Sequence, residues 1–128
     1  MNVLAVLVAA VSSFLLGGVW YSKAAFGEIW TEEAGRGSEP QRGHPAKVFA
    51  VSFLFALVAA AGFALLLGPN PPFLDAVFKG LLAGVCFVMA SFGINYQFAE
   101  RSTTMWLIDG GYHAAQFLLF GIILGLWH

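Results

Sequence analysis

Charged side chains are scarce in this chain of 128 residues. Lys, Arg, Asp and Glu make up 10% of it, whereas an ordinary soluble domain has about 25%. Hydrophobic residues make up 59%, and the mean hydropathy is +0.80. The net charge of −1 also excludes the basic surface on which nucleic-acid binding depends. We therefore expect an integral membrane protein whose partner is the lipid bilayer and not a nucleic acid.

Cysteine and recognisable catalytic motifs are also lacking. Cys86 is the single cysteine, so no disulfide can form within one chain. The sequence has no glycine-rich phosphate loop, no Ser-His-Asp arrangement and no zinc-type spacing. A positive segment before the first apolar run is missing too, which argues against a removable signal peptide. These absences disfavour an enzyme, and they give no reason to expect a cofactor.

The chain does contain four apolar runs, at about residues 2–21, 46–67, 73–96 and 105–127. Each is close to the roughly 20 residues that a helix needs to cross a bilayer. We predict an all-α fold, a four-transmembrane-helix up-down bundle that forms a single domain over residues 1–128. The short connection at 68–72 predicts that the second and third helices are antiparallel neighbours. Thr103 or Thr104 is expected to cap the fourth helix.

Positive side chains gather on one side of the predicted bundle. Five lie at or near the loops after the first and third helices: Lys23, Arg36, Arg42, Lys47 and Arg101. The opposite side holds Lys79 alone. The positive-inside rule predicts that the 22–45 loop is cytoplasmic and that both termini lie outside the cytoplasm. Within this loop, residues 26–30 are apolar enough to form a short helix along the membrane surface.

Small residues recur at helical spacing. GxxxG pairs occur at Gly80 and Gly84 and at Gly121 and Gly125, and such pairs let two membrane helices approach closely. The first run also contains a row of small residues, each four positions after the one before: Ala5, Ala9, Ser13 and Gly17. These faces exceed what one small bundle needs, so we predict a parallel homo-oligomer, with a dimer favoured.

The ends of the first and third runs resemble each other. Gly18-Val-Trp-Tyr21 ends the first run and Gly93-Ile-Asn-Tyr96 ends the third, and a polar turn and a tryptophan follow each. This similarity suggests a parallel two-helix pseudo-repeat, with its axis along the membrane normal.

The sharpest functional clue is a polar stripe in the fourth run. Asp109, Tyr112, His113 and Gln116 fall at i, i+3, i+4 and i+7, on one face of a helix. Ionisable residues at such depth are rare unless they face protein, water or a ligand. Other polar or interfacial residues are expected in the same half of the bundle: Trp20, Tyr21, Asn95 and Tyr96. Ser13, Ser91 and Gln116 are expected to reach toward the midplane. Since the other half has almost no polar groups, we expect a blind pocket open to the cytoplasm and not a channel.

Several interpretations of the stripe remain open. It can be a structural knot, in which Asp109 bonds to His113 and Tyr112 bonds to Asn95 or to backbone. It can bind a small molecule or lipid headgroup, or use His113 as a titrating group in proton-coupled chemistry. A metal site is least supported, because Asp109 and His113 supply only two ligands.

The leading function is binding or transport of a small molecule or lipid headgroup through this cytoplasm-facing pocket. A structural or assembly subunit is the second hypothesis, and a membrane-embedded enzyme is the third. In all of them we expect Tyr112 and His113 to face the bundle interior, near Tyr21, Ser91 or Asn95. The four tryptophans are interpreted as anchors at the membrane interface.

A family resemblance rests on elements from both halves of the chain: Gly17-Gly-Val-Trp-Tyr-Ser22 with Trp30, Asn95-Tyr96, Gly111-Tyr-His113 and Gly121-Ile-Ile-Leu-Gly-Leu-Trp127. With these elements the chain resembles the bacterial membrane proteins grouped as domain of unknown function 1761. The resemblance implies a four-helix protein of the bacterial inner membrane with no established activity. That family commonly has proline where this chain has Lys23 and asparagine where it has Asp109.

Overall fold

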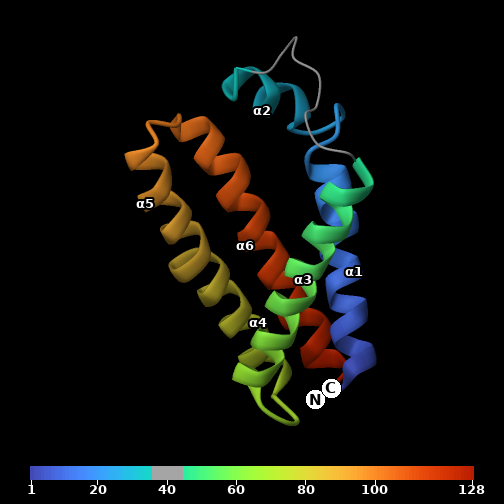
Figure 1. Cartoon of the computed structure of the whole chain (residues 1–128). Helices are drawn as coiled ribbons and strands as arrows, with labels where there is room; N and C mark the ends of the chain where they lie inside the picture. The colour runs from blue at the N-terminus through green and yellow to red at the C-terminus, as the bar shows by residue number, and fades with distance from the viewer. Residues whose placement is uncertain (36–44) are drawn as a thin grey trace.

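The computed structural model describes residues 1–35 and 45–128 (Figure 1). The elements in chain order are α1 (Val3–Trp20), α2 (Gly27–Glu33), α3 (Pro45–Leu67), α4 (Phe73–Leu82), the π-helix η1 (Ala83–Met89), α5 (Ala90–Phe98) and α6 (Thr103–Leu126). Since α4, η1 and α5 follow one another without a break, they form a single span, Phe73–Phe98. The prediction of an all-α fold is confirmed.

Among the residues that the structure describes, four helical spans are long and apolar enough to cross a membrane, as predicted for an integral membrane protein. Their ends follow from local capping. The Asn2 side chain accepts a hydrogen bond from the Ala5 N–H at 3.1 Å, so α1 begins at Val3. The cap of α6 is Ser102, whose hydroxyl accepts from the Met105 N–H at 3.1 Å. The predicted cap at Thr103 or Thr104 is therefore wrong, because the extended backbone ends at Ser102 and both threonines already lie in the helix.

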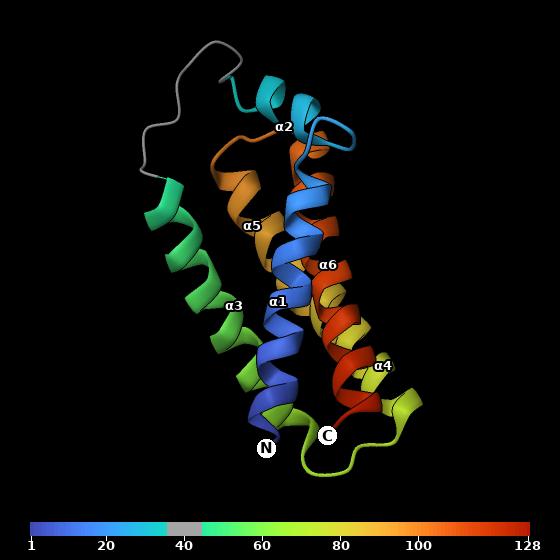
Figure 2. The same cartoon turned by 90° about the vertical axis from the view of Figure 1, so that its right-hand side faces the viewer.

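The helices run up and down, with both termini at one end and α2 and the α5–α6 turn at the other (Figure 1). Helix α6 packs against α4 and η1 on one side and against α1 on the other. Helix α3 packs mainly against α1 and has only a small contact with α4. The 68–72 loop thus reverses the chain direction without making α3 and α4 packed neighbours along their length. Figure 2 shows that the C-terminal end of α3 lies close to α1, whereas the N-terminal end of α3 lies away from α1.

Glycines bring α4 and η1 against the backbone of α6. A Cβ atom on Gly80 would lie 2.4 Å from the Phe117 carbonyl oxygen, and one on Gly121 would lie 2.5 Å from that of Ala76. A Cβ atom on Gly84 would lie 2.8 Å from the Cα of Ala114. These GxxxG glycines therefore serve a contact within the chain and lend no support to a subunit interface. Homo-oligomerisation stays a prediction.

The π-helical turn of η1 is accommodated by a side chain from α6. A π-helix is a local irregularity that often lies at functional sites. The Trp106 indole N–H donates to the Met89 carbonyl oxygen at 2.9 Å, at the end of η1. Trp106, expected at the membrane interface, thus has a specific partner that fixes η1 against α6.

Candidate functional site

The Asp109 carboxylate is the centre of one polar cluster. Asp109 is only 7% exposed. Its Oδ1 accepts from the Tyr21 hydroxyl at 2.5 Å, and its Oδ2 accepts from the Trp30 indole N–H at 3.2 Å and from the Tyr96 hydroxyl. These donors lie at the end of α1, in α2 and in α5, so one carboxylate joins α6 to three other segments. The donors replace the water that the buried oxygens have lost.

A tight turn positions the donors from α1 and α2. The Phe26 N–H donates to the Trp20 carbonyl at 3.0 Å, and the Gly27 N–H donates to the Ser22 carbonyl at 2.9 Å. A Cβ atom on Gly27 would lie 2.3 Å from the Tyr21 carbonyl oxygen, so a side chain does not fit there. Glycine at this position lets α2 begin directly over the end of α1, which brings Trp30 to Asp109.

The Tyr21 hydroxyl remains a donor over the physiological range. Burial, and then the hydrogen bond to Asp109, raise the pKa of Tyr21 well above its usual value. The Trp20 indole N–H adds a separate bond to the Ile108 carbonyl at 2.9 Å, one residue before Asp109. The end of α1 is therefore tied to α6 through two adjacent aromatic residues.

A second polar network runs from the middle of α6 to α1. The Tyr112 hydroxyl donates to the Ser13 carbonyl at 2.9 Å. His113 Nδ1 lies 2.7 Å from Gln116 Oε1, and Gln116 Nε2 donates to Ser13 Oγ at 3.4 Å. Tyr112 thus bonds to backbone across the bundle, which is one of the two partners predicted for it. His113 bonds to Gln116 and not, as predicted, to Asp109. The reason is that donors from other segments occupy Asp109, while the stripe faces α1.

Next to this second network lies a cavity of about 1000 Å³ between α1, α3, η1 and α6. The polar side chains that line it are Tyr21, Ser52, Tyr112, His113 and Gln116. The remaining wall is mostly apolar and includes Phe14, Phe49, Phe55, Val88 and Phe117. We call this space the His113 cavity. Its α6 wall is polar apart from Phe117 and its α3 wall is apolar apart from Ser52, which suits a molecule with one polar and one apolar part.

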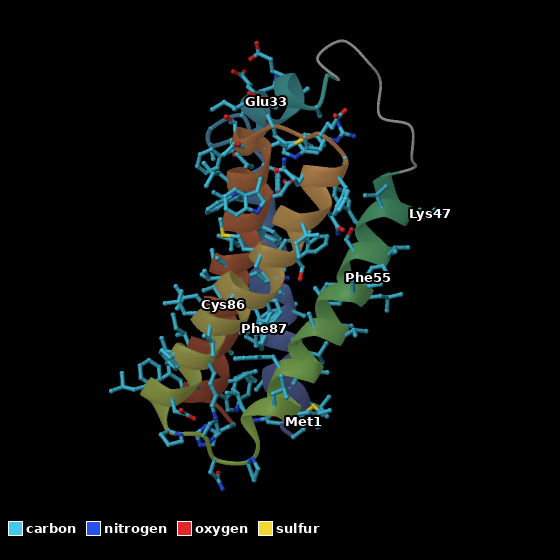
Figure 3. All side chains as sticks on the ribbon, turned by 90° about the vertical axis from the view of Figure 1, so that its left-hand side faces the viewer. Met1, Glu33, Lys47, Phe55, Cys86 and Phe87 are labelled. Carbon is cyan, nitrogen blue, oxygen red and sulfur yellow. The ribbon has the colours of Figure 1, made fainter. Side chains whose placement is uncertain are left out.

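The course of α3 explains why the His113 cavity exists. Phe14 of α1 contacts Phe49 and Phe53 of α3, with ring centroids 5.8 and 5.9 Å apart, but α3 does not pack along η1 and α5. Figure 3 shows α3, with Lys47 and Phe55, set apart from η1, with Cys86 and Phe87. The cavity is therefore only partly enclosed, and its gap lies between α3 and the Phe73–Phe98 span.

The structure divides the predicted site residues into three groups. Tyr96 and Trp20 belong to the surroundings of Asp109, and Tyr21 reaches both that cluster and the His113 cavity. Tyr112, His113 and Gln116 line the cavity. The third group, Ser91 and Asn95, is exposed on α5, away from both.

Sequence reasoning missed three participants. Trp30 was expected only at the membrane interface, yet it donates to Asp109. Ser13 was grouped with small packing residues and as a polar group near the midplane, yet it accepts from both Tyr112 and Gln116. Ser52 lines the cavity from α3. Of the three, only the position of Trp30 could have been inferred from the sequence. Trp30 follows Tyr21 after a short polar turn, so the two side chains can lie near each other.

Comparison with known protein families gives a match over nearly the whole chain. The sequence matches the family described as Protein of unknown function (DUF1761) over residues 4–125, so the chain belongs to that family. No curated protein and no solved structure matches the chain. The predicted resemblance is confirmed.

Proposed function

We propose that this member of the DUF1761 family binds an amphipathic, membrane-dissolved small molecule or lipid in the His113 cavity. The observation that carries the proposal is the cavity itself, with a polar α6 wall opposite an apolar α3 wall. Its volume of about 1000 Å³ is at the upper end of the roughly 300–1,000 Å³ typical of ligand pockets. Binding is the core of the proposal, and transport of the same molecule is its extension.

The depth of the polar wall supports a ligand that arrives through the bilayer. His113 is the eleventh residue of α6, so it lies about 15 Å along the helix axis at 1.5 Å per residue. That distance is about half of the ~30 Å hydrocarbon layer. A lipid-like molecule can reach this depth through the gap between α3 and η1, whereas a strongly hydrated solute would have to lose its water.

We further propose that the cavity lies in the cytoplasmic half of a bacterial inner membrane. Lys23 follows α1, Lys47 lies in the first turn of α3 and Arg101 lies between α5 and α6. These segments lie toward the α2 end, and the termini lie at the other end (Figure 1). By the positive-inside rule the α2 end faces the cytoplasm. Reporter fusions after Arg101 should then read cytoplasmic, and fusions after His128 should read external. A cytoplasmic signal after His128 would reverse the orientation.

The Asp109 cluster favours a second function, that of a structural or assembly subunit. A carboxylate with three donors from three segments holds helices together without needing a ligand. Asp109 does not line the His113 cavity, so the two polar networks can have separate roles. The experiment must therefore change the cavity without changing the cluster.

Native mass spectrometry on protein purified with its membrane lipids tests the proposal. Gly18 lines the cavity, and a Cβ atom there would meet nothing within 4 Å, so Gly18→Leu should fill the space without a backbone clash. Gly62→Leu is the matched control, because Gly62 is also a helical glycine in open space but lies outside the cavity. We expect a bound amphiphile in the wild type and in Gly62→Leu, and its loss in Gly18→Leu. Retention by Gly18→Leu, or a ligand-free wild type, would refute the binding function.

A further inference from the structure

We infer that the ligand of the His113 cavity is an uncharged amphiphile with a hydroxyl headgroup, which donates a hydrogen bond to Nε2 of His113. The inference rests on the proposed function, because it assigns the headgroup of the molecule bound there. It follows from a chain of hydrogen bonds that fixes the position of each hydrogen atom on the polar wall.

The chain begins at Ser13, which lies fully buried in α1. Its hydroxyl donates to the Ala10 carbonyl oxygen at 3.0 Å. A carbonyl can only accept and a hydroxyl has one hydrogen, so Ser13 Oγ can only accept from any other partner. The Gln116 atom 3.4 Å from it must therefore be the amide nitrogen, which donates. This orientation turns Oε1 of Gln116 toward His113.

The orientation of Gln116 then decides the tautomer of His113. Nδ1 of His113 lies 2.7 Å from Gln116 Oε1, an oxygen that can only accept, so Nδ1 carries the hydrogen. In a neutral imidazole the other nitrogen, Nε2, is then a bare acceptor. Nε2 has no hydrogen-bond partner in the part of the chain that the structure describes. Every fully buried side-chain N or O atom in that part has a partner, so an atom without one cannot be fully buried. Nε2 is therefore accessible, and His113 lines the cavity.

Tyr112, like Nε2 of His113, can offer only a hydrogen-bond acceptor to the cavity. Its hydroxyl hydrogen points to the Ser13 carbonyl, so toward the cavity its oxygen can only accept. Gln116 is 5% exposed and has both ends of its amide engaged. The middle of the polar wall thus offers acceptors, and the complementary headgroup must bring a donor.

The absence of positive side chains from the cavity wall further restricts which headgroups can bind. None of the described residues that line the cavity is Lys or Arg, and an unpaired anion at this depth is costly. Phosphate and carboxylate headgroups are therefore disfavoured. A ketone or ester headgroup has no hydrogen to donate and would leave Nε2 unpaired. A hydroxyl is neutral and has a hydrogen to donate to Nε2.

The test uses protein labelled with ¹⁵N-histidine in phosphatidylcholine nanodiscs. The three histidines are separated by comparison with His113→Gln. We expect the spectrum of wild-type His113 to show a protonated Nδ1 and an unprotonated Nε2. Oleyl alcohol should shift the Nε2 signal, and it should bind about tenfold more tightly than oleyl methyl ether, which has the same chain and no donor. Oleyl phosphate should bind more weakly than the alcohol.

The variant His113→Phe sharpens the comparison of the two probes. Without Nε2, the alcohol should lose its advantage over the ether, whereas Gly62→Leu should keep it. Equal affinity of the wild type for alcohol and ether, or a protonated Nε2, would overturn the headgroup assignment and leave the proposed function standing. Failure of both probes to bind would instead refute the binding function. The wild-type tautomer is assigned with His113→Gln and the ether comparison is made on the wild type, so neither depends on whether His113→Phe folds.

Discussion

The two sides of α6 are packed in opposite ways. Toward α4 and η1, Gly80, Gly84 and Gly121 bring backbone against backbone, and no space for even a Cβ atom remains. Toward α3 the two helices meet only through side chains such as Phe63 and Phe117, whose ring centroids lie 5.7 Å apart, and a cavity of about 1000 Å³ lies between α6 and the N-terminal half of α3. The difference indicates that the glycine contact makes a rigid frame, while the α3 side keeps space for a ligand.

The largest expected effect comes from breaking the rigid side. In Gly121→Leu the new side chain would overlap the Ala76 carbonyl, which lies 2.5 Å from the Cβ position. Since neither backbone can yield cheaply, we expect a loss of about 3 kcal/mol or more in the free energy of unfolding. Gly62→Leu, placed in open space, is the control and should remain near wild type. Circular dichroism during unfolding in detergent measures both. Equal stability of the two variants would contradict the glycine frame.

The next effect concerns Asp109, which joins α6 to the end of α1, to α2 and to α5. Asp109→Ala leaves three donors without an acceptor, and we expect it to cost about 2–3 kcal/mol in the free energy of unfolding. Asp109→Asn should cost less than about 1 kcal/mol, because its oxygen can still accept from Trp30 and Tyr96 while the Tyr21 hydroxyl turns to accept from the amide. Denaturation followed by circular dichroism in detergent would show the order. A cost for Asn as large as that for Ala would mean that the negative charge itself is required.

The smallest expected effect is a pH dependence of the same cluster. Because the pKa of Tyr21 is raised by burial and by Asp109, the unfolded chain loses this proton near pH 10 while the folded chain keeps it. The contribution of Tyr21 to stability is therefore present below pH 10 and falls as the pH rises above it, by at most about 1.4 kcal/mol per pH unit. Unfolding between pH 9 and 11.5 should show a shallower decline for Tyr21→Phe than for the wild type. Identical declines would show that Tyr21 does not hold its proton in the fold.

These tests bear on what sequence can predict. The four spans follow from the length of the apolar runs, because a bilayer requires about 20 residues per helix. The inward direction of Tyr112, His113 and Gln116 follows from the cost of exposing them to lipid. Both features depend only on the local sequence and its solvent, so they were predictable.

The partners of the stripe depend on tertiary geometry and were not predictable. Trp30 reaches Asp109 only because the Gly27 turn folds α2 over the end of α1. The GxxxG pairs were assigned to subunit contact, since sequence cannot distinguish a partner helix in the same chain from one in another. The divergence of α3 from α1 could not be predicted either. Apolar residues lie on all sides of α3, so its sequence does not indicate which face packs.

The most direct test of the central claim is an experimental density map of the protein in lipid nanodiscs at a resolution that shows side chains. The account predicts elongated non-protein density between α3 and α6, with its polar end at His113 and its apolar part along Phe49 and Phe55. Helix α3 packed against η1, with no space beside His113, would contradict it.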